Sequence, residues 1–98
     1  MNTEQKQNEK AVKLLEEIEA RYYSKVNFKV MRDYFVQELA NAERDNLQEK
    51  DPKRYDFVKK TCEMFNAQYD AVKNEYEQLI EQAKLTGVLG EEYQPGQN

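Results

Sequence analysis

Two clusters of basic and aromatic residues are the part of this sequence best suited to bind another molecule. Cations beside aromatic rings can hold a phosphate or a nucleotide, particularly near the start of a helix. Exposed aromatic residues with arginine are typical of protein-binding hot spots. The candidate residues for an anionic ligand are Arg21, Tyr22, Tyr23, Lys25, Lys29 and Arg32, and those for a protein partner are Lys53, Arg54, Tyr55, Phe57 and Lys60.

Each cluster also has a purely structural interpretation. In the first, Tyr22 packs inward and the cations neutralise the acidic second half of the C-terminal helix. In the second, the residues form a capped helix start that carries ordinary surface cations. The sequence alone leaves both interpretations open.

Other site chemistry is excluded by composition. The chain has no histidine and one cysteine, so a zinc site of the Cys/His type is not available. Ser24 is the only serine, and without histidine no Ser-His or Cys-His nucleophile can be assembled. Carboxylate pairs such as Glu16 with Glu19 are typical of a solvated helix face. We therefore predict no enzyme activity and assign no catalytic residue, metal ligand or cofactor.

A seven-residue repeat between residues 55 and 83 is the strongest structural pattern. Its members follow one another at steps of three and four residues, which places them in one stripe along a helix that must be buried against other helices. We expect Phe65 and Tyr69 to be central to the core and Cys62 to be a buried thiol. The stripe comprises Tyr55, Val58, Cys62, Phe65, Tyr69, Val72, Tyr76, Leu79 and Ala83.

The elements that would position both clusters are three helices, at about residues 3–23, 28–50 and 52–86. Ser24 to Asn27 is interpreted as a tight connection, and Asp51-Pro52 is a strong N-cap and first-turn pair. Gly87 supplies a left-handed stop. These features predict an all-α, three-helix antiparallel bundle with coiled-coil-like packing and a long C-terminal helix. Residues 1–87 would form a single helical domain and residues 88–98 a flexible tail.

Charge and composition indicate the setting in which the protein acts. The net charge is −4, which does not favour nucleic acid as a partner. No run of about 18 apolar residues is present, so no membrane span is expected. With a single cysteine there is no sign of an oxidising compartment, and we expect a cytoplasmic protein.

The predicted function is that of a small non-enzymatic helical interaction protein, an adaptor, an inhibitor or a phage-type accessory factor. The third helix has an apolar face about twice as long as either of the others. Its two ends, with Tyr55, Phe57 and Val58 at one and Ala83 and Leu85 at the other, would lack a partner within the chain. We therefore predict a homodimer through this helix, together with an unidentified protein partner. The alternative is a binder of a small anionic ligand at the first cluster.

Overall fold

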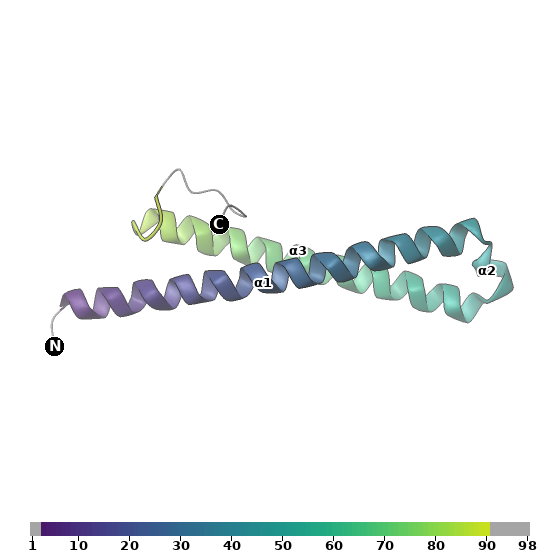
Figure 1. Cartoon of the computed structure of the whole chain (residues 1–98), viewed down its shortest axis with the longest axis horizontal. Helices are drawn as coiled ribbons and strands as arrows, with labels where there is room; N and C mark the ends of the chain where they lie inside the picture. The colour runs from purple at the N-terminus through teal and green to yellow at the C-terminus, as the bar shows by residue number, and fades with distance from the viewer. Residues whose placement is uncertain (1–2, 91–98) are drawn as a thin grey trace. The chain divides into compact units, whose positions relative to one another are not determined.

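The computed structural model describes residues 3–90, and helices account for most of them. The helices are α1 (Thr3–Arg44), α2 (Leu47–Lys50) and α3 (Pro52–Leu85) (Figure 1). No strand occurs in this part of the chain. The predicted all-α class is therefore confirmed.

Helix α1 is continuous through the region that was predicted to be a connection. The helical assignment runs without interruption across Ser24 to Asn27. These residues include neither glycine nor proline, and serine or asparagine costs a helix only a few tenths of a kcal/mol relative to alanine. The prediction of two separate helices at 3–23 and 28–50 was wrong. The three-helix antiparallel bundle is not confirmed, because two of its long helices are one.

Partly buried cations on the face of α1 that packs against α3, which we call the seam, explain why the sequence did not predict one continuous helix. Side chains of reduced exposure recur every three or four residues from Ala11 to Ala42, and this series includes Arg21, Lys25 and Arg32. The aliphatic stem of a long cationic side chain can cover apolar surface while its charged end reaches water. The apolar residues alone show a gap between Tyr22 and Phe28, because Lys25 occupies the inward-facing position there.

The end of α1 is set by Asn46, so the predicted extension of this helix to Lys50 was also wrong. Asn46 has φ 55° and ψ 37°, the left-handed conformation that asparagine tolerates better than most residues. Its N–H donates to the carbonyl of Glu43 at 3.2 Å. The single turn of α2 follows before Asp51.

The start of α3 confirms the predicted cap. The carboxylate Oδ1 of Asp51 accepts a hydrogen bond from the N–H of Arg54 at 3.2 Å, and the Asp51 carbonyl accepts one from the N–H of Tyr55 at 3.0 Å. Pro52 occupies the first helical position, where its missing N–H has no partner to lose. The observed end at Leu85 lies one residue before the predicted one.

By their contacts, the described residues divide into two compact units. Unit 1 contains the residues up to Lys25 and those from Val72 onward, and unit 2 is Val26–Ala71. In each unit a part of α1 lies against a part of α3. The single domain predicted for residues 1–87 stays a prediction.

The core of unit 1 is centred on Tyr76. Its buried members are Ile18, Tyr76, Ile80 and Ala83, and partly buried Leu14, Tyr22, Leu79, Val88 and Leu89 pack against them. In unit 2 the buried residues are Ala42, Val58 and Cys62. The prediction of a buried Cys62 thiol is thereby confirmed.

Phe65 and Tyr69 are only half-buried, contrary to their predicted place at the centre of the core. The Phe65 ring stacks on Phe35, with centroids 5.7 Å apart, and lies 6.4 Å from Phe28. The ring of Tyr69 is covered by the guanidinium of Arg32. These two residues therefore lie towards the edge of the seam.

The ends of the α3 stripe are mostly covered within the chain, which corrects the basis of the predicted homodimer. Val58 is 2% exposed and Ala83 is fully buried, whereas both were expected to lack a partner. Tyr55 is half-buried, and only Phe57 and Leu85 remain exposed. The difference arises because α1 is one long helix, so its apolar face is not shorter than that of α3.

The chain turns back at Gly87 in a Schellman motif. The N–H of Gly87 donates to the carbonyl of Lys84 at 3.1 Å, and the N–H of Val88 donates to that of Ala83 at 2.8 Å. Val88 and Leu89 then pack on the unit 1 core. Val88 thus folds back towards Ala83. The flexible tail predicted for residues 88–98 stays a prediction, and its part at 91–98 lies outside the described residues.

Substitution of Gly87 by alanine is expected to lower the free energy of unfolding by about 1 kcal/mol. Gly87 has φ 79°, and a left-handed residue with a side chain costs roughly 1–2 kcal/mol. The space that an alanine Cβ would occupy is open, with no neighbouring atom within 4 Å, so backbone strain alone would cause the loss. Urea denaturation would measure it. An unchanged midpoint would contradict the Schellman geometry.

Candidate functional site

The cations predicted to bind an anionic ligand have partners within the chain. In unit 1, Nε of Arg21 donates to Oε2 of Glu75 at 2.7 Å. Nζ of Lys25 lies 4.6 Å from the ring centroid of Tyr76 and 5.6 Å from that of Tyr22. The contacts with Glu75 and Tyr76 join α1 to α3, and the pairing of Arg21 with Glu75 agrees with the structural interpretation of this cluster.

The remaining cations of this cluster lie in unit 2. The guanidinium carbon of Arg32 is 4.3 Å from the ring centroid of Tyr69, and its NH2 group is 3.0 Å from Oδ1 of Asp33. Nζ of Lys29 is 3.9 Å from Oδ2 of the same aspartate. Tyr23 is 59% exposed. Each cation thus has a carboxylate or a ring beside it, and binding of an anionic ligand here stays a prediction without added support.

The residues predicted to bind a protein partner lie in the first turns of α3. The hydroxyl of Tyr55 donates to Oε1 of Glu43 at 3.4 Å, which ties this ring to the end of α1. Nζ of Lys60 is 3.0 Å from Oδ2 of Asp56, one turn earlier on the helix. Lys53 is exposed. The exposed members of this cluster are therefore Lys53, Arg54, Phe57 and Lys60.

Tyr34 and Glu38 of α1 are considered together with Arg54 and Phe57 of α3 because the charge of Arg54 acts on the pKa of Tyr34. We call these four residues the tip patch. The guanidinium carbon of Arg54 is 5.6 Å from the ring centroid of Phe57. A hydrogen bond to Glu38, reinforced by the negative charge of that carboxylate, raises the pKa of Tyr34 above its usual value, while the charge of Arg54 acts in the opposite direction.

The sequence analysis missed Tyr34 and Glu38 as site residues. Tyr34 was not among the predicted site residues, yet it is 57% exposed. The spacing of four residues between Tyr34 and Glu38 was the available signal, because residues at that spacing are neighbours on a helix. Their proximity to Arg54 depends on the register of α1 against α3, which no local pattern contains.

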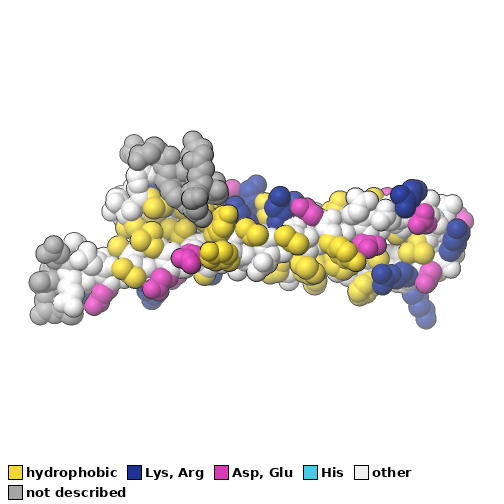
Figure 2. All heavy atoms as spheres, in the orientation of Figure 1, with side chains coloured by type: hydrophobic (Ala, Val, Ile, Leu, Met, Phe, Trp, Pro, Cys, Tyr) yellow, Lys and Arg dark blue, Asp and Glu magenta, His cyan; other side chains and the backbone are white. Residues whose placement is uncertain are grey.

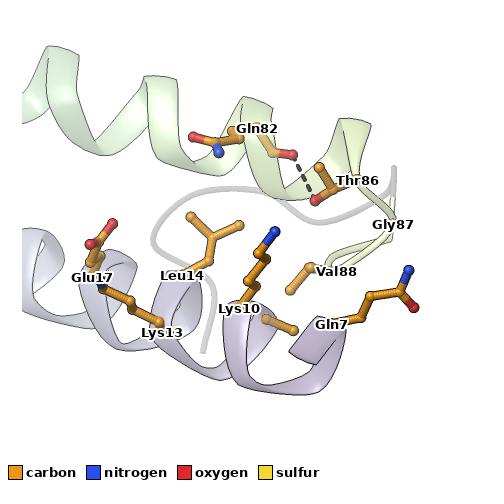
Figure 3. A pocket seen from close by; sticks show the side chains of 10 residues that line it. Gln7, Lys10, Lys13, Leu14, Glu17, Gln82, Thr86, Gly87 and Val88 are labelled. Atoms are coloured by element: carbon orange, nitrogen blue, oxygen red, sulfur yellow. Dashed lines mark hydrogen bonds between the residues drawn. The ribbon is translucent and has the colours of Figure 1, made fainter. Parts of the chain in front are cut away.

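An open cleft in unit 1 was not predicted either. It has a volume of about 770 Å³ and lies between α1 and the turn after α3. Lys10 and Leu14 project from α1 toward α3, and Val88 projects from the turn into the same space (Figure 3). The Oγ1 hydroxyl of Thr86 donates to the carbonyl of Gln82 at 3.0 Å and closes the last turn of α3 at its edge. The lining of the cleft includes apolar side chains, two amino groups and one carboxylate, from Ala11, Leu14, Val88, Lys10, Lys13 and Glu17.

No group of acidic or cysteine side chains within residues 3–90 is arranged to hold a metal ion. Among these residues, no helix combines the length and the apolar character required to cross a membrane. Comparison of the chain with protein families, with curated proteins and with solved structures found no match. The function must therefore be argued from the surfaces of the chain itself.

Proposed function

We propose that the chain is a small, non-enzymatic helical interaction protein that self-associates and binds a protein partner. The supporting observation is the apolar surface that the helices leave open. Eleven large hydrophobic side chains of the described residues are exposed, eight on α1 and three on α3. They are Val12, Leu15, Tyr23, Val26, Val30, Met31, Tyr34 and Val36 on α1, and Phe57, Met64 and Leu85 on α3.

Exposed apolar side chains on this scale favour association. Burying a large one is worth roughly 1.5–3 kcal/mol, and contiguous patches on a soluble protein often mark an interaction surface. Hydrophobic side chains reach the visible surface at many points along the helices (Figure 2). A helix from a second copy laid on α1 would bury several of them. That helix would also act as the third helix of a bundle with coiled-coil-like packing, which the sequence predicted within one chain.

The distribution of these side chains favours α1 over α3 as the self-association surface. Sequence reasoning had chosen α3 because Val58 and Ala83 were expected to be open, and both are buried. Val30, at 61% exposed, is instead the most open large hydrophobic residue of α1. We therefore propose that α1, and not α3, forms the interface of the homodimer.

Sedimentation equilibrium at micromolar concentrations is expected to give a mass above 11.7 kDa that rises with concentration. Val30→Glu should raise the dissociation constant at least about tenfold, since a charge replaces a side chain whose burial is worth roughly 1.5 kcal/mol or more. Gln68→Glu, an exposed change on α3, is the matched control and should have little effect. Circular dichroism checks that both variants stay helical.

Other outcomes of this experiment would contradict the proposal in distinct ways. A mass of 11.7 kDa at every concentration would exclude self-association. If Val30→Glu has no effect while charge reversal at Lys59 and Lys60 dissociates the assembly, α3 is the interface, as the sequence first suggested.

A further inference from the structure

The cleft of unit 1 has one wall made by a single face of α1. Gln7, Lys10, Leu14 and Glu17 follow one another at steps of three and four residues, so they lie on the same side of the helix. Opposite them lie the last turn of α3 and the turn that follows it (Figure 3). Both walls belong to unit 1, so the site can be described within that unit alone.

The floor of the cleft is apolar. Ala11 and Leu14 from α1 and Val88 from the turn are half-buried, and each borders the cleft with the part that remains exposed. Leu14 and Val88 also pack on the unit 1 core, which holds this surface in place. The volume of about 770 Å³ lies within the range of pockets that bind small organic molecules, roughly 300–1,000 Å³.

The charge presented to the cleft is slightly positive. Among the described residues, its charged lining consists of Lys10, Lys13 and Glu17, a net charge of +1, and the α3 side contributes no charge. Glu9 and Glu16, the other carboxylates between residues 7 and 17, line a separate hollow. A single negative charge in the cleft would therefore be attracted, although weakly, by its surroundings.

Lys10 supplies the amino group for such an anion. Its side chain projects from α1 across the cleft toward α3 (Figure 3). Within residues 3–90 this side chain has neither an ion pair nor a hydrogen bond. The carbonyl of Gln82 already accepts from the hydroxyl of Thr86 at 3.0 Å, and that of Ala83 from the N–H of Val88 at 2.8 Å. Lys10 is therefore not engaged in capping α3.

We propose that the cleft binds a small organic acid that consists of a hydrocarbon tail and one carboxylate. The tail would lie on Ala11, Leu14 and Val88, where it is removed from water. The carboxylate would accept a hydrogen bond from the amino group of Lys10, and a charge-assisted bond is roughly twice as strong as a neutral one. This inference goes beyond the proposed function and depends neither on self-association nor on a protein partner.

The lining also argues against other classes of ligand. A nucleotide or another multiply charged anion would be repelled by Glu17, which lines the same cleft as Lys10. A quaternary ammonium ion is usually held by aromatic rings, and none of the described lining residues is aromatic. The side-chain amides of Gln7 and Gln82 border the cleft and can donate to the second carboxylate oxygen.

The test compares three small molecules that separate the tail from the charge. Titration of decanoate, below its micelle concentration, into the ¹⁵N-labelled full chain is expected to give a dissociation constant below about 1 mM. Amide shifts in ¹⁵N-¹H NMR should centre on Lys10, Leu14 and Val88. Acetate has the carboxylate without the tail, and decyltrimethylammonium has the tail with the opposite charge. Each should bind at least about tenfold more weakly than decanoate.

Two variants examine the two walls, each with a matched control. Lys10→Glu should weaken decanoate binding at least about tenfold, whereas Lys73→Glu, an equal change of charge at an exposed position of α3, should leave it nearly unchanged. Gln82→Glu should also weaken binding, because a carboxylate then faces the ligand from α3. Gln68→Glu, an exposed change on α3 in unit 2, is its control. Circular dichroism checks that each variant stays helical.

Several results would overturn the proposal. Equal binding of decanoate and decyltrimethylammonium, or shifts spread over exposed apolar residues such as Val26 and Val30, would mean that the tail alone associates with the surface. Equal effects of Lys10→Glu and Lys73→Glu would remove Lys10 from the site. Binding of acetate as strong as that of decanoate would refute the role of the apolar floor. A strictly monomeric chain that binds decanoate in the cleft would refute self-association alone.

Discussion

Replacing Tyr76 by alanine is expected to lower the free energy of unfolding by about 3–5 kcal/mol, the usual cost of deleting a buried aromatic ring. Tyr76 is 1% exposed and is one of the two largest fully buried side chains among the described residues. Its ring centroid lies 5.9 Å from that of Tyr22, and Nζ of Lys25 lies 4.6 Å from it. Its removal would leave a cavity and deprive Lys25 of the nearer of its two aromatic partners.

Chemical denaturation followed by circular dichroism measures this loss. A small domain has only about 5–15 kcal/mol of stability in total, so the variant should unfold at much lower denaturant. Tyr23→Ala is the matched control, because Tyr23 is 59% exposed, and its cost should stay below about 1 kcal/mol. Similar losses for the two variants would mean that Tyr76 is not the centre of the unit 1 core.

The burial of Tyr76 illustrates how much of the core could be predicted from the sequence. The heptad stripe of α3 was predicted correctly as a stripe, since buried and half-buried residues recur along it. The degree of burial of each member was not predicted correctly, because Phe65 and Tyr69 are only half-buried by the side chains opposite them. The burial of each residue depends on which side chains of α1 lie opposite it, and this is a property of the tertiary structure.

The two ends of α3 were the most predictable feature. Each depends on a local requirement that residue type reveals. The carboxylate of Asp51 accepts a hydrogen bond at the helix start, Pro52 lacks the N–H that would have no partner there, and Gly87 adopts a positive φ. Of the tip patch, Arg54 and Phe57 were predicted because they are neighbours on one helix. Tyr34 and Glu38 come from a helix that is distant in sequence, so the patch could be only half predicted.

Proline at position 27 is expected to lower the free energy of unfolding by about 3 kcal/mol or more. In a continuous helix the N–H of Asn27 donates to the carbonyl of Tyr23, and proline removes that bond and places its ring against the same carbonyl. Asn27 is exposed, so no packing contact is lost with its side chain. The whole effect would report on the backbone of α1.

Position 27 separates the two interpretations of this segment. If Ser24 to Asn27 were a connection, with Asn27 as the cap of a second helix, proline there would interrupt no helical hydrogen bond and would cost under about 1 kcal/mol. Asn27→Ala is the matched control: in a continuous helix it should be neutral or stabilise by a few tenths of a kcal/mol, whereas removal of a cap would cost about 1 kcal/mol. Asn27→Pro is the more costly substitution in a continuous helix, whereas Asn27→Ala costs stability only where Asn27 caps a helix. Denaturation of both variants therefore decides whether α1 is continuous through this segment.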